Sequence, residues 1–203
     1  MTAFGSPNGP DRARGDWGFA DDVRRQLLSR RVVLVHGPID DELCAATAAT
    51  LMMLDATGDE RIVVRLTGAD APLEQGLVLM DVIAVLGVPV DVAAAGTLAG
   101  GAVGVLAAGR HRTLSAHARL HLREPEGTVA GRAAEIERAL AAQAAQREQF
   151  FARIGACTGR PVEVVEESWR AARYLEPADA VAMGYADDVE ETSPARAVGD
   201  DDA

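Results

Sequence analysis

The stretch Val88–Gly109, VPVDVAAAGTLAGGAVGVLAAG, carries the clearest sign of the fold. Its first part, residues 88–96, is a short apolar run closed by glycine, which is typical of a buried strand. Residues 98–109 are rich in glycine and alanine, and we expect a helix that packs closely on a sheet. Such a turn from strand to helix is where an enzyme often positions a nucleophile. Residues 96–109, however, contain no serine and no cysteine.

The alternation of strand and helix extends towards the N-terminus. β-branched runs closed by glycine predict strands over residues 30–37 and 61–68. Apolar residues at helical spacing predict helices over 38–58, with Asp40 or Asp41 near the start, and over 73–87. Strand, helix and strand in repeated order require right-handed parallel crossovers, so the fold class is α/β.

The C-terminal half continues with one strand and three helices. The strand is expected over residues 113–124, with alternating polar and apolar residues. A long helix is expected from about residue 132 to 157. Two short helices, each opened by a proline, are expected over 161–172 and 176–184.

The two ends of the chain differ from the rest in composition. Residues 1–18 are rich in glycine, proline and aspartate, and residues 191–203 are acidic without an apolar period. We expect a flexible N-terminal segment and a disordered acidic tail on either side of one domain, residues 19–190.

Charge and cysteine usage exclude several classes of function. The net charge of −11 disfavours nucleic-acid binding and attachment to anionic membranes. The N-terminus lacks an apolar signal region, and no apolar run is long enough to span a bilayer. Cys44 and Cys157 show neither disulfide nor metal-knuckle spacing. We expect a cytoplasmic protein with reduced thiols and without a metal or cofactor.

Several sequence words occur in the order and at the spacing of a known family, the proteolytic subunit of the ATP-dependent Clp protease, ClpP. The chain resembles this family over roughly residues 22–189. The words are RRVVLVHGPIDDELCAATAATLMMLDA, GLVLMDVIAVLGVPV, AAGTLAGGAVGVLAAG, LREPEG, TGRPVEVVEES and RYLEPADAVAMGYAD.

The resemblance implies a ClpP/crotonase-like fold of stacked βαβ units with a protruding handle helix. It also implies self-association into heptameric rings, with two rings closing a chamber as a tetradecamer. The handle would be the helix at about 132–157, which meets its counterpart in the facing ring. Phe150 and Phe151 would pack there or, alternatively, in the core of their own chain.

The same resemblance locates the three groups of a serine-protease triad. Gly100 stands where the family has its serine, Arg123 where it has its histidine, and Ala172 where it has its aspartate. A hydroxyl, an imidazole and a carboxylate must cooperate in this chemistry, and a guanidinium cannot act as a general base near neutral pH. We therefore expect a member of the family without catalytic residues, a pseudoprotease.

The oxyanion hole is expected to be altered as well. The family builds it partly from a Gly-Gly turn after the second strand, where this chain has Asp70 and Ala71, and partly from the residue after the serine, here Gly101. A carboxylate beside a developing negative charge opposes the transition state by repulsion.

Other residues of the chain could supply the hydroxyl and the base of a triad. The chain offers Thr97 and Ser115 as hydroxyls and His36, His111, His117 and His121 as bases. The alternation of His117, Arg119, His121 and Arg123 predicts one basic strand face, which could lie opposite Asp70 or Glu124. We expect neither a second triad nor a two-histidine metal site from this pattern.

Three functions remain open at this stage. The first is a ring-forming scaffold or regulatory subunit of a Clp protease system, alone or with an active ClpP paralogue. The second is an active serine endopeptidase with unrecognised catalytic residues. The third is a crotonase-like acyl-CoA enzyme that uses Asp70 and Glu124. The resemblance also places Val63 and Arg65 in the apolar socket for a Clp ATPase, where a charge disfavours docking.

Overall fold

The computed structural model describes residues 18–123 and 132–190. The acidic tail at 191–203 and Glu124 lie outside the described residues, as does the predicted flexible segment except for Gly18. Within the described part, no helix combines the length and the apolar character needed to span a bilayer.

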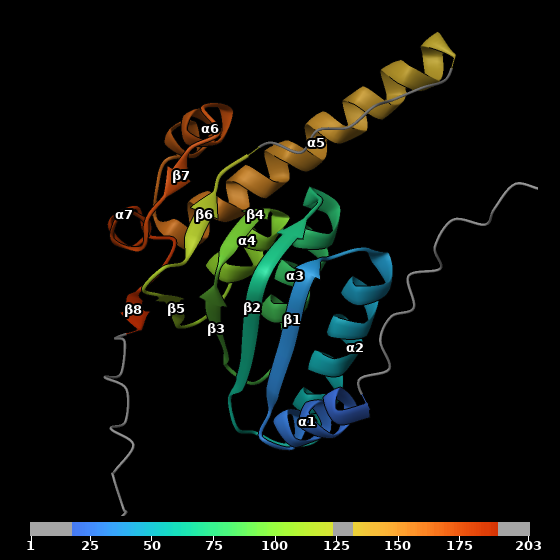
Figure 1. Ribbon diagram of the computed structural model, residues 1–203. Coiled ribbons are helices and arrows are strands. Elements are labelled where there is room, and N and C mark those ends of the chain that lie inside the picture. The colour runs from blue at the N-terminus through green and yellow to red at the C-terminus, as the bar shows by residue number, and fades with distance from the viewer. Residues whose placement is uncertain (1–17, 124–131, 191–203) are drawn as a thin grey trace, which may run out of the picture.

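The described residues form an eight-stranded sheet in the order β7-β6-β4-β2-β3-β5-β8, with β1 paired to β2 (Figure 1). All strand pairs are parallel except β6 with β7. The predicted parallel crossovers and the α/β fold class are therefore confirmed. The strands are β1 Val32–Pro38, β2 Ile62–Ala71, β3 Val90–Ala95, β4 Thr97–Gly100, β5 Arg112–Ser115, β6 Arg119–His121, β7 Tyr174–Leu175 and β8 Asp188–Glu190.

Three helices, α2, α3 and α4, pack against one another and against the sheet, and α5 extends away from it (Figure 1). Helix α2 begins as predicted, because the carboxylate of Asp40 accepts a hydrogen bond from the Leu43 N–H at 2.9 Å. The helices are α1 Gly18–Ser29, α2 Asp41–Ala56, α3 Leu73–Val85, α4 Gly101–Ala107, α5 Ala133–Thr158, α6 Val162–Arg170 and α7 Pro177–Ala182.

Strand β2 is the longest strand described, and its two ends have different neighbours. Its first part pairs with β1 and β3, whereas Asp70 and Ala71 at its carboxyl end pair with Ala99 and Gly100 of β4. The end of β2 therefore lies directly beside the glycine-rich turn.

The prediction of one helix over residues 98–109 was wrong at its start. Residues 97–100 form β4, because their backbone pairs with β2 on one side and with β6 on the other. Gly100 then turns the chain into α4 with φ +55° and ψ −136°, which a helix cannot contain.

The single strand predicted over residues 113–124 was also wrong. The chain turns between β5 and β6, where the Ala118 N–H donates to the Ser115 carbonyl at 2.9 Å. Strand β5 pairs with β3 and β8, whereas β6 pairs with β4 and β7, so the two halves belong to different parts of the sheet. His117 lies in the turn and not on the predicted strand face.

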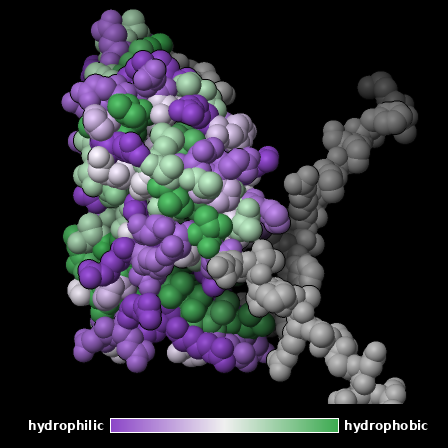
Figure 2. Space-filling view, turned by 90° about the vertical axis from the view of Figure 1, so that its left-hand side faces the viewer, coloured by the Kyte–Doolittle hydropathy of each residue, from purple (hydrophilic) through white to green (hydrophobic). Residues whose placement is uncertain are grey.

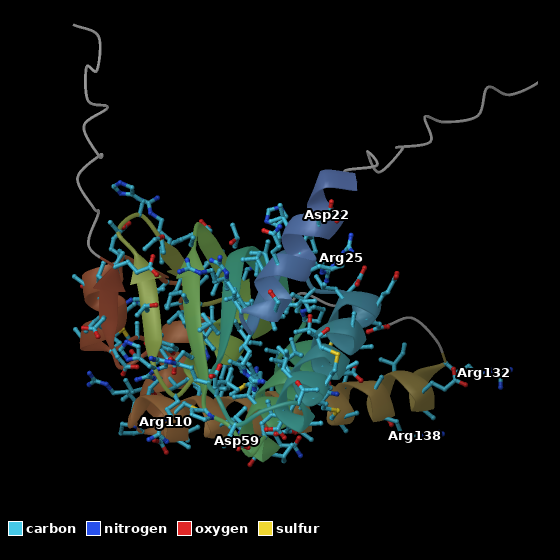
Figure 3. The ribbon with its side chains drawn as sticks, turned by 90° about the horizontal axis from the view of Figure 1, so that it is seen from below. Asp22, Arg25, Asp59, Arg110, Arg132 and Arg138 are labelled. Carbon is cyan, nitrogen blue, oxygen red and sulfur yellow. The ribbon has the colours of Figure 1, made fainter. Side chains whose placement is uncertain are left out.

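Helix α1 was not predicted. It lies across the lower end of β1, and Asp22 and Arg25, one turn apart, form an ion pair on its surface (Figure 3). Its partly buried Leu27 and Leu28 face the domain. The segment around it is charged, which obscured this short apolar pair in the sequence.

The buried residues of helix α5 lie near its C-terminal end. Phe150, Phe151 and Ile154 are buried, and both phenyl rings contact the ring of Trp169 in α6. The alternative in which these phenylalanines pack within their own chain is therefore correct, and the one that places them against a facing ring is wrong. Arg138 lies on the part of α5 that projects from the body, and Arg132 directly precedes the helix (Figure 3).

Candidate functional site

The elbow at Gly100 connects β4 to α4 in the interior of the domain. Gly100 and every residue of α4 are buried. The positive φ at Gly100 is a conformation that favours glycine. The strand-turn-helix geometry that can present a nucleophile is therefore present, with a residue that has no side chain at its apex.

An ion pair between Asp70 and Arg123 lies across this elbow. Asp70 is at the end of β2 and opposite Ala99 of β4, while Arg123 follows β6 on the other side of β4. One guanidinium nitrogen of Arg123 donates to Oδ2 of Asp70. The Arg123 side chain is 34% exposed and that of Asp70 is 43% exposed. The sequence analysis predicted that the basic strand face could lie opposite Asp70 or Glu124. Glu124 lies outside the described residues, and Asp70 contacts Arg123 of that face.

A cavity of about 330 Å³ opens beside the pair. Its walls combine the charged pair and Asp40 with apolar side chains from the ends of β1 and β2. The residues lining it are Pro38, Ile39, Asp40, Asp70, Ala71, Pro72, Gly100 and Arg123. Sequence reasoning did not assign Ile39 or Asp40 to the site, although both follow directly on the predicted first strand.

Ala172 lies near the same edge of the sheet but does not line the cavity. It occupies the turn between α6 and β7 with φ +46°. The adjoining Arg173 carbonyl accepts a hydrogen bond from the Leu122 N–H at 2.8 Å, which holds this turn beside the end of β6. A methyl side chain here cannot orient or stabilise an imidazole.

His121 of β6 precedes Arg123 by two residues. Its ring stacks on Tyr174 with centroids 3.9 Å apart, so β6 and β7 hold it in place. Burial lowers the pKa of His121, the charge of Arg123 lowers it further, and Asp70 acts in the opposite direction. The neutral imidazole is therefore favoured. No sequence signal pointed to Tyr174 as its partner.

The other proposed substitutes are scattered over the fold. His36 on β1 contacts the Thr67 carbonyl through Nδ1 at 3.0 Å, and His111 lies 3.6 Å from a carboxylate oxygen of Asp188. Thr97 begins β4 and Ser115 ends β5. Among the described residues, these hydroxyls and imidazoles do not meet in a hydroxyl–imidazole–carboxylate set. The same residues contain no group of three metal-ligating side chains.

The positions named for the ATPase socket lie on the exposed face of β2. Val63 is half-buried, and Arg65 is exposed. The Arg65 guanidinium lies 3.6 Å from a carboxylate oxygen of Glu190, which follows Val189 on β8. A loose ion pair therefore lies on this side of the sheet.

Comparison with known proteins assigns the chain to one class, the Clp proteases. A family model described as Clp protease matches residues 15–193, and the chain belongs to this family. It is 28% identical over 194 residues to the ATP-dependent Clp protease proteolytic subunit-related protein 2, chloroplastic, of Arabidopsis thaliana, covering 93% of this chain and 69% of that protein.

Two bacterial relatives are equally similar. The chain is 28% identical over 180 residues to the ATP-dependent Clp protease proteolytic subunit 2 of Thermobifida fusca, covering 86% of this chain and 87% of the relative. It is 28% identical over 184 residues to the proteolytic subunit 2 of Chlamydia muridarum, covering 88% and 89%. The relatives are thus matched over most of their length.

Proposed function

We propose that this chain is a non-catalytic, ring-forming subunit of an ATP-dependent Clp protease system. One observation carries the proposal: the elbow is occupied by Gly100 and spanned by the Asp70–Arg123 ion pair. Acyl transfer on this fold needs a hydroxyl, a base and an orienting carboxylate. Gly100, Arg123 and Ala172, the residues proposed to replace them, supply none of these groups.

The electrostatics of the elbow support the same conclusion. Removing even one donor of an oxyanion hole slows a serine protease by about 10²–10³-fold. Here the Asp70 carboxylate lies beside the turn, and Arg123 cannot accept a proton. Because Asp70 is held by Arg123, we do not propose it as the base of an acyl-CoA enzyme.

An activity assay with the purified chain tests this proposal. We expect no cleavage of casein or of a dipeptide amide and no labelling by a serine-directed fluorophosphonate. A Clp protease proteolytic subunit from a bacterial relative serves as the positive control. Labelling that is lost when a single serine or threonine is replaced would instead establish an active endopeptidase with unrecognised residues.

Helix α2 supports assembly with other subunits. Its outward face carries Met52 and Met53, which are 51% and 50% exposed, together with the exposed Ala45, Ala49 and Ala56. Residues 43–54 of α2 are apolar except for Thr47 and Thr50, and a helix that is apolar on all sides is normally covered. We propose that a neighbouring subunit, a second copy or an active paralogue, covers this face.

Apolar residues are also exposed on other sides of the molecule. Figure 2 shows the side that carries α6, α7 and β8 in Figure 1, where hydrophobic residues are mixed with hydrophilic ones and gather towards the lower end. Val164 of α6 and Val189 of β8 are 42% and 37% exposed. Apolar surface on more than one side is what a head-to-tail ring requires, because each subunit then has two neighbours.

Native mass spectrometry tests assembly separately from activity. We expect the chain to form rings alone or on mixing with an active ClpP paralogue, and Met53→Glu to prevent this. Glu42→Gln, an exposed change on the same helix, is the matched control. Circular dichroism shows whether both variants fold. A chain that stays monomeric with and without the paralogue would refute the assembly part of the proposal.

The cytoplasm is the proposed compartment. Cys44 and Cys157 are free thiols. Burial raises the pKa of both thiols, which keeps them protonated and weakly reactive. Free, unreactive thiols of this kind are typical of a reducing compartment.

A further inference from the structure

The backbone around Gly100 leaves no room for a side chain. A β-carbon added at this position would lie 2.5 Å from the carbonyl oxygen of Ala71 and 3.2 Å from Oδ1 of Asp70. Real β-carbons essentially never approach another heavy atom within 3.0 Å. The obstruction comes from backbone at the end of β2, so a rotamer change cannot relieve it.

The Asp70–Arg123 ion pair holds this obstruction in place. Asp70 immediately precedes Ala71, and its carboxylate is tied to a residue on the far side of β4. Backbone pairing of Asp70 with Ala99 and of Ala71 with Gly100 adds a second restraint. The backbone pairing does not depend on the side chain of Arg123, so it keeps the end of β2 beside the elbow when Arg123 is replaced as well.

We infer that Asp70 and Ala71 close the elbow independently of the missing nucleophile, so that replacing Gly100, Arg123 and Ala172 by serine, histidine and aspartate does not create a reactive serine. This inference rests on the proposed function, because that proposal assigns the three positions. It gives a second cause of inactivity, at Asp70 and Ala71, so restoring the three triad residues alone is not sufficient.

Asp70 would act on a restored site through its charge as well as through its size. A histidine at position 123 would lie where Asp70 now holds a guanidinium. Asp70 would be a second carboxylate beside this imidazole, in addition to the one that Ala172→Asp supplies, and the added negative charge raises the pKa of the imidazole further, so that less of it is free to accept the proton of a serine. The same carboxylate would repel the negative charge that develops on an oxyanion.

The test compares two full-length variant sets with a fluorophosphonate probe. The first set carries Gly100→Ser, Arg123→His and Ala172→Asp, and the second adds Asp70→Gly and Ala71→Gly. In labelling, the serine oxygen bonds to phosphorus, fluoride leaves, and the serine proton passes to the imidazole. Glycine at positions 70 and 71 keeps the obstructing carbonyl oxygen, but it removes the Asp70 carboxylate and gives the end of β2 the backbone freedom to move this oxygen away. We expect the first set to label no faster than the wild type and the second at least about 10-fold faster, one factor of ten being 1.4 kcal/mol.

Equal labelling of the two sets, or no labelling of a folded second set, would overturn the closure. Labelling of the unmodified chain would refute the proposed function instead, so the two failures are distinguishable. Asp70→Asn added to the first set separates charge from shape, because the amide keeps the size of the carboxylate. Full labelling with Asp70→Asn would overturn the steric part of the inference.

A stability measurement tests the same closure without activity. Gly100→Ala is introduced into the wild type and into the Asp70→Gly, Ala71→Gly background. We expect the loss in thermal midpoint to be at least halved in the second background, because Asp70→Gly removes Oδ1 and the two glycines let the carbonyl of residue 71 move away from the added methyl group. Equal losses in the two backgrounds would contradict the steric part of the closure.

Discussion

The indole N–H of Trp169 donates a hydrogen bond to the hydroxyl of Tyr185 at 3.0 Å in the interior of the domain. Both side chains are about 1% exposed. Trp169 also contacts Phe150 edge-on, with ring centroids 5.1 Å apart. One indole therefore joins α6, the base of α5 and the segment that leads to β8.

Tyr185→Phe removes the partner of the buried indole N–H. An unsatisfied buried donor costs about 1–3 kcal/mol, and we expect a lower free energy of unfolding by that amount. Urea unfolding followed by tryptophan fluorescence measures it. Tyr174→Phe is the control, because Tyr174 is 59% exposed. Equal effects of the two changes would contradict the role assigned to Tyr185.

Alkaline pH tests the burial of the same hydroxyl. Burial raises the pKa of Tyr185 to about 12, against its ordinary value of 10.0. The contribution of the protonated Tyr185 hydroxyl to the free energy of unfolding is complete below pH 10. It is lost as the pH rises towards 12, because the tyrosine of the unfolded chain deprotonates first. Two pKa units correspond to roughly 2–3 kcal/mol. Stability measured from pH 9 to 12 should fall less steeply in Tyr185→Phe than in the wild type.

Acid pH tests the buried end of Arg112. Its guanidinium donates to Asp187 through Nε at 3.0 Å and through Nη2 at 2.5 Å. These hydrogen bonds, and secondarily the charges of Arg112 and His111, lower the pKa of Asp187 against the effect of burial. The stabilisation is present above the ordinary pKa of 3.8 and is lost as the pH falls below it.

We therefore expect Asp187→Asn to lower the thermal midpoint at pH 7 and to differ less from the wild type below pH 3. Scans across this range measure the gap between the two proteins. Asp188→Asn, at the exposed carboxylate of the next residue, is the control. A gap that stays constant with pH would contradict the assignment.

Gly104→Ala tests the packing between α4 and α5. A β-carbon at this position would lie 2.6 Å from Phe150 Cε2 and 2.7 Å from Met80 Sδ. Overpacking of a core typically costs about 1–3 kcal/mol, which should appear in the urea midpoint. In Gly58→Ala the β-carbon would meet the flexible Arg31 side chain at 3.2 Å, so this matched change should cost less.

Local patterns were sufficient to predict most of the framework. Asp40 caps α2, and the apolar face with Phe150 and Ile154 belongs to α5, as their spacing indicates. Parallel pairing followed from the alternation of strands and helices, because such strands need long crossovers. Strands β7 and β8 were missed because segments of two and three residues carry no period.

Contacts between distant segments limited what could be predicted of the candidate site. Residues 97–100 have helical composition, and only pairing with β2 and β6 makes them a strand. The sequence placed Arg123 on a face opposite Asp70 or Glu124, and the structure pairs it with Asp70. The lack of space at Gly100 depends on two converging backbones, so no residue pattern could reveal it.

Helix α5 behaves mechanically as a cantilever. Its 26 residues span about 39 Å, yet its buried residues are confined to Phe150, Phe151, Ile154 and Gly155. A load applied to the free end therefore acts as a torque on the aromatic cluster around Trp169. How rigidly a contact on the outer turns is held therefore depends on the packing of this aromatic cluster, and not on the helix itself.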